Sequence, residues 1–289
     1  MNDSKIMNLA ADNIRILAAS MVEKAKSGHP GGAMGGADFI NVLYSEYLQY
    51  DPENPEWVGR DRFFLDPGHM SPMLYTQLAL IGRFTIDELK EFRQWGSATP
   101  GHPERNISRG VENTSGPLGQ GHTYAVGAAM AAKFLAARTG NPTFAKETIY
   151  AYISDGGIQE EISQGAGRVA GTLGLGNLVM FYDANDIQLS TECDVVSTED
   201  TAMKYKAWGW HVIDIDGNDC DQIRKPLTKQ RQSTTVRYSL LVNVLWVRAR
   251  ELLTIRTMSV LARLMERRSE EMHIEIQSST SVEIRTIRS

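Results

Sequence analysis

The chain has 289 residues and a formal net charge of -5, so its length allows one large α/β domain or two small ones. The negative charge does not suggest a nucleic-acid-binding surface, and no apolar run is long enough to span a bilayer. Two cysteines, Cys193 and Cys220, are too few for a disulfide framework or a cysteine metal cage. We therefore expect a cytoplasmic protein with neither a nucleic-acid nor a membrane partner.

Taken in chain order, the first half of the sequence alternates helical stretches with glycine-rich loops. Four stretches have apolar residues at helical spacing: 6–26, 38–48, 71–81 and 125–138. Residues 62–65 predict a short buried strand, and Thr85 with Glu88 forms a capping-box pattern that begins a further helix. The region 96–122 is long and irregular, and such loops in compact domains usually carry function or are disordered.

The second half contains a strand–helix–strand unit. Its parts are a strand over 148–154, a turn over 155–157, a helix over 159–173 and a strand over 178–182. The two strands should be parallel with a right-handed crossover, so Asp155 and Asn185 follow strands that end at one edge of the sheet. Open α/β sheets bind ligands at that edge. With a further strand over 210–215, we expect a doubly wound, mainly parallel α/β sheet with helices on both faces.

The residues at this edge have the chemistry of a divalent-cation site. Asp155 and Asn185 supply hard oxygen ligands, and the turn after Asn185 offers a backbone carbonyl, which we assign to Ile187. Such a set leaves room for phosphate oxygens and water around octahedral Mg²⁺. Gly156 and Gly157 allow the backbone to approach a diphosphate, which the following helix N-terminus favours. The alternative is a surface turn that merely contains Asp and Gly, and the spacing to Asn185 disfavours it.

Two other kinds of enzyme fit the sequence poorly. The first is an enzyme with a cysteine nucleophile. Cys193 lies between Glu192 and Asp194, and this acidic setting raises rather than lowers the pKa of a thiol, so the reactive thiolate is disfavoured. A dinucleotide-binding fold would need spaced glycines followed by an acidic ribose ligand, and neither 28–31 nor 156–157 supplies that pattern.

The composition changes near residue 230. All 25 glycines and all 10 prolines precede this position, whereas the segment 230–289 has ten arginines and no lysine. We back-translated two parts of this segment with chosen synonymous codons and read the DNA in a frame shifted by one base. In that frame 242–250 can read GKRFMGKGA and 264–272 can read HGAPLGGDA, and both peptides are rich in glycine. We therefore expect a domain over 1–229, a one-base slip of the reading frame within 225–232, and an aberrant tail with no assigned fold. A natural arginine-rich helical tail is the alternative.

Several short segments together resemble one enzyme family. They are Ser27-Gly28-His29-Pro30-Gly31, Asp66-Pro67-Gly68-His69, Pro100-Gly101-His102-Pro103-Glu104, the run from Thr114 to Gly121, and Ser154-Asp155-Gly156 with Asp183-Ala184-Asn185. The last pair resembles the thiamine-diphosphate signature, which usually has Gly where this chain has Ser154. The whole set resembles transketolase over about residues 5–229, and the shifted peptide HGAPLGGDA also resembles a transketolase segment.

The resemblance implies a role for individual residues. Asp155, Asn185 and the Ile187 carbonyl would hold Mg²⁺, or Ca²⁺ or Mn²⁺ in its place. Gly156 and His69 would contact the diphosphate of thiamine diphosphate.

Three further positions follow from the same resemblance. Gly116 and Leu118 would line the rings of thiamine diphosphate. Glu160 would lie near the subunit interface, where it would couple two cofactor sites.

Histidines supply the expected proton transfers. His29 and His102 would face the sugar-phosphate substrate, and a neutral imidazole near physiological pH can move protons at its hydroxyls. Both lie in Gly-His-Pro loops, which favours this role over that of a loop histidine bonded to backbone. We expect His122 and His211 to be structural.

The resemblance implies transfer of a two-carbon ketol unit between sugar phosphates in the pentose phosphate pathway, by a homodimer. The glutamate that acts on the pyrimidine ring lies on a second domain, contributed by the other subunit, and this sequence lacks it. We therefore expect the chain to be inactive alone, with a pyrimidine-binding domain or second subunit as its partner. Two alternatives are a deoxyxylulose-phosphate synthase and a non-catalytic cofactor-binding or dimerisation fragment.

Overall fold

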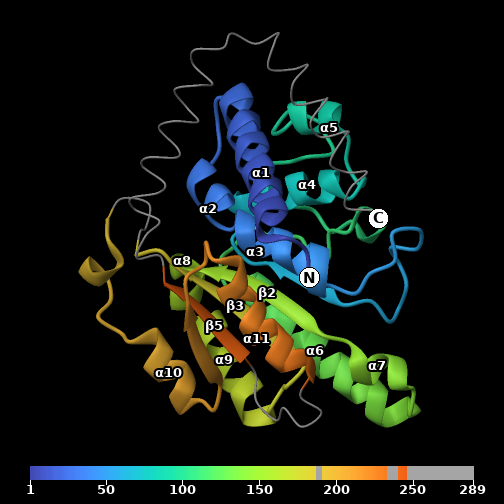
Figure 1. The fold of residues 1–289 in the computed structure, drawn as a ribbon. Helices are drawn as coiled ribbons and strands as arrows, with labels where there is room; N and C mark the ends of the chain where they lie inside the picture. Colours follow the sequence, from blue (N-terminus) through green and yellow to red (C-terminus); the bar gives the residue numbers. More distant parts are fainter. Residues whose placement is uncertain (187–190, 233–239, 246–289) are drawn as a thin grey trace.

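The fold is built on one parallel sheet, seen in a computed structural model that describes residues 1–186, 191–232 and 240–245 (Figure 1). The strands are β1 (Arg62–Leu65), β2 (Ile149–Ser154), β3 (Leu178–Ala184), β4 (His211–Ile215) and β5 (Leu240–Leu245). They lie in the order β1-β2-β3-β5-β4, and every neighbouring pair is parallel. The predicted fold class, a doubly wound α/β sheet, is confirmed.

Helices cover both faces of this sheet. The longer ones are α1 (Ser4–Ala25), α4 (Ser71–Leu80), α6 (Gln120–Thr139), α9 (Glu161–Leu173) and α11 (Cys220–Gln232). The shorter α-helices are α2 (Pro30–Gly35), α3 (Ala37–Val42), α5 (Ile86–Lys90), α7 (Pro142–Lys146), α8 (Asp155–Gln159) and α10 (Thr201–Ala207). A π-helix, η1 (Leu43–Tyr47), follows α3, and the 3-10 helices are η2 (Gly68–Met70), η3 (Ile107–Arg109) and η4 (Cys193–Val195).

Alternation along the strands divides the core into two layers. On β2, Tyr150 and Tyr152 face the layer that contains α1, α3, α4 and α11. Ile149, Ala151 and Ile153 face the layer that contains α6, α9 and α10. Successive side chains of a strand point to opposite faces, and both faces of this sheet are buried, which explains the continuous apolar strand sequences.

The helix after β2 differs from the prediction. We expected a turn at 155–157 and one helix at 159–173. In the structure α8 begins at Asp155, and the helical conformation is interrupted at Glu160 before α9 begins. Ser154 explains the early start, because its hydroxyl oxygen accepts the N–H of Gly157 at 3.4 Å and so caps α8. Glu160 has extended backbone angles, which separates the two helices.

The described sheet continues past residue 229, where the composition suggested a domain boundary. Helix α11 runs on to Gln232, and β5 lies inside the sheet between β3 and β4. Residues 246–289 lie outside the described residues, so the aberrant tail stays a prediction there. No helix of the described part is long and apolar enough to cross a membrane.

Candidate active site

The edge of the sheet where β1, β2 and β3 end carries two predicted site residues, Asp155 and Asn185, together with Asp66. Asp66 directly follows β1, Asp155 follows β2, and Asn185 follows β3. The strands are parallel neighbours, with Ser154 opposite Asp183, so these three ends meet at one edge. This is the edge at which open parallel sheets bind their ligands.

Asp155 is held from two sides. Its Oδ1 accepts the hydroxyl of Tyr182 at 2.5 Å, and its Oδ2 accepts the backbone N–H groups of Asn185 at 3.0 Å and Asp186 at 2.9 Å. Burial raises the pKa of Asp155, while the bonds from Tyr182 and the two amides lower it. The side chain of Cys193 is a further hydrogen-bond partner of Asp155, so the orientation of this carboxylate is set by side chains and backbone together.

The glycines after Asp155 fit closely against the neighbouring strand end. A Cβ at Gly157 would lie 2.4 Å from Oδ1 of Asp66, and one at Gly156 would lie 3.1 Å from Cδ1 of Leu118. The predicted diphosphate contact Gly156 is therefore adjacent to Leu118, a predicted ring contact. Ser154, where the family usually has Gly, adopts extended backbone angles that any residue can take.

Asp66 is a buried carboxylate that the sequence did not single out. Its Oδ1 accepts the N–H of Gly119 at 3.0 Å and its Oδ2 accepts the N–H of His122 at 3.1 Å, so it caps the N-terminus of α6. Its backbone carbonyl accepts the hydroxyl of Ser115 at 3.2 Å. Burial raises the pKa of Asp66 to about 6 although these amides oppose the shift.

The loop that precedes α6 packs onto the loop after β1. A Cβ at Gly68 would lie 2.4 Å from the Ser115 hydroxyl and 3.0 Å from the nitrogen of Gly116. The N–H of Ser115 donates to the carbonyl of Pro103 at 3.0 Å, which ties this loop to the second Gly-His-Pro segment. Gly116 itself has open space at its Cβ position, as a position against a ligand ring requires.

Three predicted histidines come together beside these loops. The rings of His29 and His69 have centroids 5.0 Å apart, and a Cβ at Gly68 would lie 2.9 Å from Cδ2 of His102. Burial, then the neighbouring His29 and His102, lower the pKa of His69 to about 4. Burial, Arg93 and His29 lower the pKa of His102. These two imidazoles are therefore neutral near physiological pH.

His122 is structural in this fold. It is fully buried, its Nδ1 lies 2.7 Å from the hydroxyl of Ser163, and burial lowers its pKa to about 3. A neutral buried histidine bonded between α6 and α9 serves packing. His211, on β4, lies outside this group of loops.

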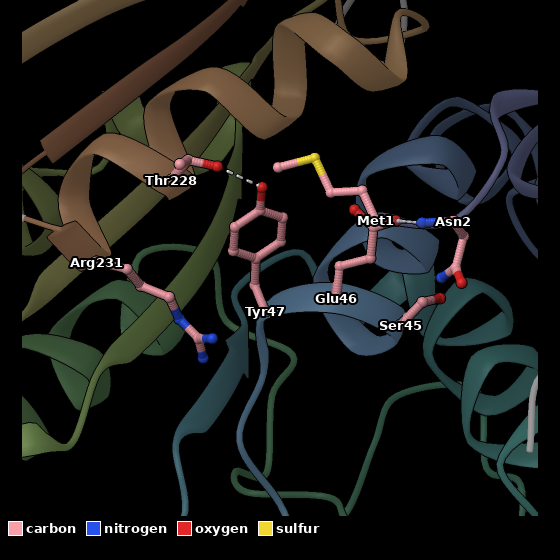
Figure 2. Close-up of a pocket in the computed structure, with 7 residues that line it drawn as sticks. All are labelled: Met1, Asn2, Ser45, Glu46, Tyr47, Thr228 and Arg231. Atoms are coloured by element: carbon pink, nitrogen blue, oxygen red, sulfur yellow. Dashed lines mark hydrogen bonds between the residues drawn. The ribbon is translucent and has the colours of Figure 1, made fainter. Parts of the chain in front are cut away.

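A cavity of about 430 Å³ lies elsewhere, between η1 and α11 (Figure 2). It is lined by Met1, Asn2, Ser45, Glu46, Tyr47, Thr228 and Arg231. Its charged groups have partners, because Glu46 pairs with Arg224 at 2.8 Å and Arg231 with Asp61 at 3.3 Å. None of the predicted site residues lines it, so we place the candidate site at the sheet edge.

Known proteins resemble most of the chain. Residues 6–244 match the family model for transketolase, thiamine diphosphate binding domain. Transketolase 1 of Escherichia coli (strain K12) is 47% identical over 228 residues, which cover 78% of this chain and 34% of that protein. Transketolase 1 of Pasteurella multocida (strain Pm70) is 46% identical over 236 residues, covering 80% of this chain and 35% of that protein. The chain belongs to the transketolase family.

Solved structures agree with this assignment. Transketolase from Leishmania mexicana superposes with a TM-score of 0.78 at 40% identity, over 82% of this chain and 36% of that chain. Transketolase from Campylobacter jejuni gives a TM-score of 0.74 at 37% identity, over 84% and 38% of the two chains. This transketolase-family chain therefore spans about a third of the length of the relatives that it matches.

The amino-acid sequence matches the transketolase family model as far as residue 244. That is beyond the range 225–232 in which the sequence suggested a slip of the frame. It agrees with the position of β5 in the sheet.

The predicted cation ligands suit the ion that the transketolase family implies. Among the described residues, no group of three His, Cys, Asp or Glu side chains could hold a metal. The predicted set is of another kind, with one carboxylate from Asp155, the Asn185 side chain and a backbone carbonyl. Mg²⁺ keeps several waters and is bound through one or two carboxylates plus phosphate oxygens, so this set fits. Ile187 lies outside the described residues.

Glu160 lies at the surface between the two helical segments. It occupies the N-cap position of α9 without a side-chain capping bond, and a Cβ at Gly119 would lie 3.0 Å from the Glu160 Cβ, so this side chain borders the start of α6. The N–H of Glu160 donates to the carbonyl of Gly157 at 3.3 Å. Glu160, the predicted interface residue, is thus joined by a backbone hydrogen bond to Gly157, which follows the predicted diphosphate contact Gly156.

Proposed function

We propose that this chain binds thiamine diphosphate through its diphosphate and a divalent cation, and supplies that half of a transketolase active site. The intact enzyme would transfer a two-carbon ketol unit between sugar phosphates. One observation carries the proposal. Hydrogen bonds from Tyr182 and from the N–H groups of Asn185 and Asp186 orient the Asp155 carboxylate at the sheet edge, directly before Gly156 and Gly157.

The cation would be held by Asp155, the Asn185 side chain and the Ile187 carbonyl. Gly156 and His69 would contact the diphosphate, where a neutral imidazole donates a hydrogen bond without adding a second positive charge. Mg²⁺ is the ion that this oxygen set suits best, and Ca²⁺ or Mn²⁺ would replace it.

Thiamine diphosphate, when bound, supplies an electron sink for the carbon that is transferred. Gly116 and Leu118 would enclose its rings. His29 and His102 would move protons at the hydroxyl groups of the sugar phosphate. The lowered pKa of His102 supports this role, because a neutral imidazole can accept a proton near physiological pH.

An exposed apolar surface supports a partner subunit. We name the α6–α9 face by its exposed side chains, which are Tyr124, Met130, Phe134, Ile162, Val169 and Leu173. Met130 and Phe134 are four residues apart on α6, and Ile162, Val169 and Leu173 follow one another at seven and four residues on α9, which packs against α6. Phe134 is 66% exposed. Clustered apolar side chains of this kind mark interaction sites, so we propose that a second subunit or a pyrimidine-binding domain covers this face.

Binding of the cofactor tests the proposal directly. Calorimetry on the full chain with thiamine diphosphate and Mg²⁺ should detect binding that Asp155→Ala abolishes. Asp194→Ala, which removes an exposed carboxylate of η4, should leave binding unchanged and is the matched control. No binding by the unsubstituted chain would refute the proposal for this chain alone.

The second candidate is a non-catalytic cofactor-binding or dimerisation fragment. It is favoured by the share of each relative that the chain covers, which is about a third. Adding a separately expressed pyrimidine-binding domain distinguishes the two. Recovery of ketol transfer supports the enzyme half, whereas cofactor binding without transfer supports the fragment.

We also propose that the reading frame changes close to residue 244, where the family match ends. The shifted peptide over 264–272 resembles a transketolase segment, which supports a change of frame before residue 264. Sequencing the coding DNA tests it, and an intact frame through 289 would refute it. The cytoplasmic location stays a proposal that rests on the two unbridged cysteines, Cys193 and Cys220.

A further inference from the structure

The hydroxyl of Tyr182 is a buried group that the proposed function does not yet use. Tyr182 lies on β3 opposite Ile153, and its ring packs in the layer beneath α6 and α9. Only 7% of the residue is exposed. Its hydroxyl donates to Oδ1 of Asp155 at 2.5 Å, across two neighbouring strands.

The bond from Tyr182 joins a buried hydroxyl donor to a carboxylate acceptor. A hydroxyl that donates to a charged carboxylate forms a stronger bond than a neutral pair does. The bond therefore holds Oδ1 of Asp155 in position.

The other oxygen of Asp155 is fixed by the loop that carries a second proposed ligand. Oδ2 accepts the N–H groups of Asn185 and Asp186, so the carboxylate is held between the side chain of Tyr182 and the backbone after β3. The plane of the carboxylate is thereby determined from both ends. Tyr182 donates through its side chain, as Cys193 also does, so its bond can be removed without changing the backbone.

We propose that Tyr182 is a positioning residue that orients Asp155 for the divalent cation. The inference rests on the proposed function, because it concerns the same cation site. Partners that orient a metal ligand commonly change metal affinity by about 10- to 100-fold when they are removed. The hydroxyl thus acts on the cation through Asp155 and does not touch it.

The neighbouring strand provides a matched control. Tyr152, on β2, is 1% exposed, and its hydroxyl donates to Oδ2 of Asp183 at 2.9 Å. Tyr152→Phe and Tyr182→Phe each remove a buried hydroxyl that donates to a carboxylate. The two variants differ in the carboxylate that loses its donor. Tyr182→Phe affects Asp155, whereas Tyr152→Phe affects Asp183, which has no proposed role in binding the cation.

The experiment measures binding of thiamine diphosphate to the full chain at increasing concentrations of Mg²⁺, and again with Ca²⁺. Tyr182→Phe should raise the Mg²⁺ concentration for half-saturation by about 10- to 100-fold. Tyr152→Phe should change it by less than about threefold, although both variants melt at lower temperature.

The ratio of the two metals separates positioning from general destabilisation. Mg²⁺ demands nearly ideal octahedral geometry, whereas Ca²⁺ accepts irregular ligand positions. Tyr182→Phe should therefore weaken the Mg²⁺-dependent binding at least about fivefold more than the Ca²⁺-dependent binding. Both metals are compared on one sample, so a partly unfolded population leaves the ratio unchanged.

Three results would overturn the inference. Tyr182→Phe could bind with an unchanged Mg²⁺ dependence, or Tyr152→Phe could lose as much affinity as Tyr182→Phe does. Absence of cofactor binding in the unsubstituted chain would overturn the proposed function and this inference together. In the first two results the unsubstituted chain still binds, so the two failures are distinguishable.

Discussion

The ends of β1 and β2 carry the same residue type in two different settings. Asp66 follows β1, and its two oxygens accept N–H groups at the start of α6. Asp155 follows β2, and its oxygens accept the hydroxyl of Tyr182 and two N–H groups of the loop after β3. Position at a sheet edge therefore does not determine which groups surround an aspartate. The donors to Asp66 belong to the start of a helix that it supports, whereas those to Asp155 belong to the strand and loop of the cation site that we propose.

The largest expected effect is on stability at the first of these positions. Asp66→Ala removes two hydrogen bonds to a charged acceptor and leaves the buried N–H groups of Gly119 and His122 unpaired. We expect a loss of about 3 kcal/mol in the free energy of unfolding, measured by urea denaturation. Asp155→Ala should lose only about 1–2 kcal/mol, because Asn185 and Asp186 lie nearer to water. Equal losses in the two variants would contradict the comparison.

The second effect is a dependence of stability on pH. The folded-state pKa of Asp66, about 6, is raised above its unfolded value of about 3.9, so the folded state binds this proton more tightly. The part of the stability that depends on protonation of Asp66 is complete below about pH 4 and is lost as the pH rises through about 6. A pKa shift of this size corresponds to at most about 3 kcal/mol in the free energy of unfolding.

Asp66→Asn should flatten the stability curve between about pH 4 and pH 6, as measured by urea denaturation at each pH. Burial also raises the pKa of Asp61 to about 6, so part of the slope should remain until Asp61→Asn is added. An unchanged slope in Asp66→Asn would show that its carboxyl titrates as an exposed group does.

A smaller effect on stability concerns Gly156 and Gly157, which follow Asp155. Gly157→Ala places a methyl group 2.4 Å from Oδ1 of Asp66, which cannot move without losing its bonds to α6. We expect a loss of about 2 kcal/mol and weaker cofactor binding. Gly156→Ala meets only the end of the Leu118 side chain at 3.1 Å, so thermal unfolding should detect less than about 1 kcal/mol. The reverse order would mean that Asp66 is free to move.

The smallest effect on stability should come from the surface remote from both aspartates. Phe134→Glu with Val169→Glu on the α6–α9 face should leave the free energy of unfolding within about 0.5 kcal/mol, because both side chains are exposed. Self-association in sedimentation velocity should decrease. Ile6→Glu with Leu9→Glu on α1 is the matched control, and an equal decrease there would contradict a specific interface.

The sequence predicted the parts of the site that depend on local patterns. The strand over 62–65, the capping box of Thr85 and the parallel unit that carries Asp155 and Asn185 all follow from periodicity and turn residues, and the structure has them. Convergence of the histidine loops also agrees with their glycine- and proline-rich sequences.

The sequence did not predict the partners that distant segments supply. Tyr182 has the pattern of a core strand residue, and only the register with β2 brings its hydroxyl to Asp155. Asp66 binds amides 53 and 56 residues away, which no local pattern encodes. A signal was available for Asp66, because a charged residue directly after a buried strand requires a partner.

The order of the strands has a consequence for synthesis of the protein. Among the described strands, β4 pairs only with β5, and β5 also pairs with β3, although β5 is the last of them to leave the ribosome. Until residue 245 has emerged, β3 and β4 each present an unpaired edge, and such edges invite pairing with other chains. A nascent chain paused before residue 240 is therefore the species that most needs a chaperone.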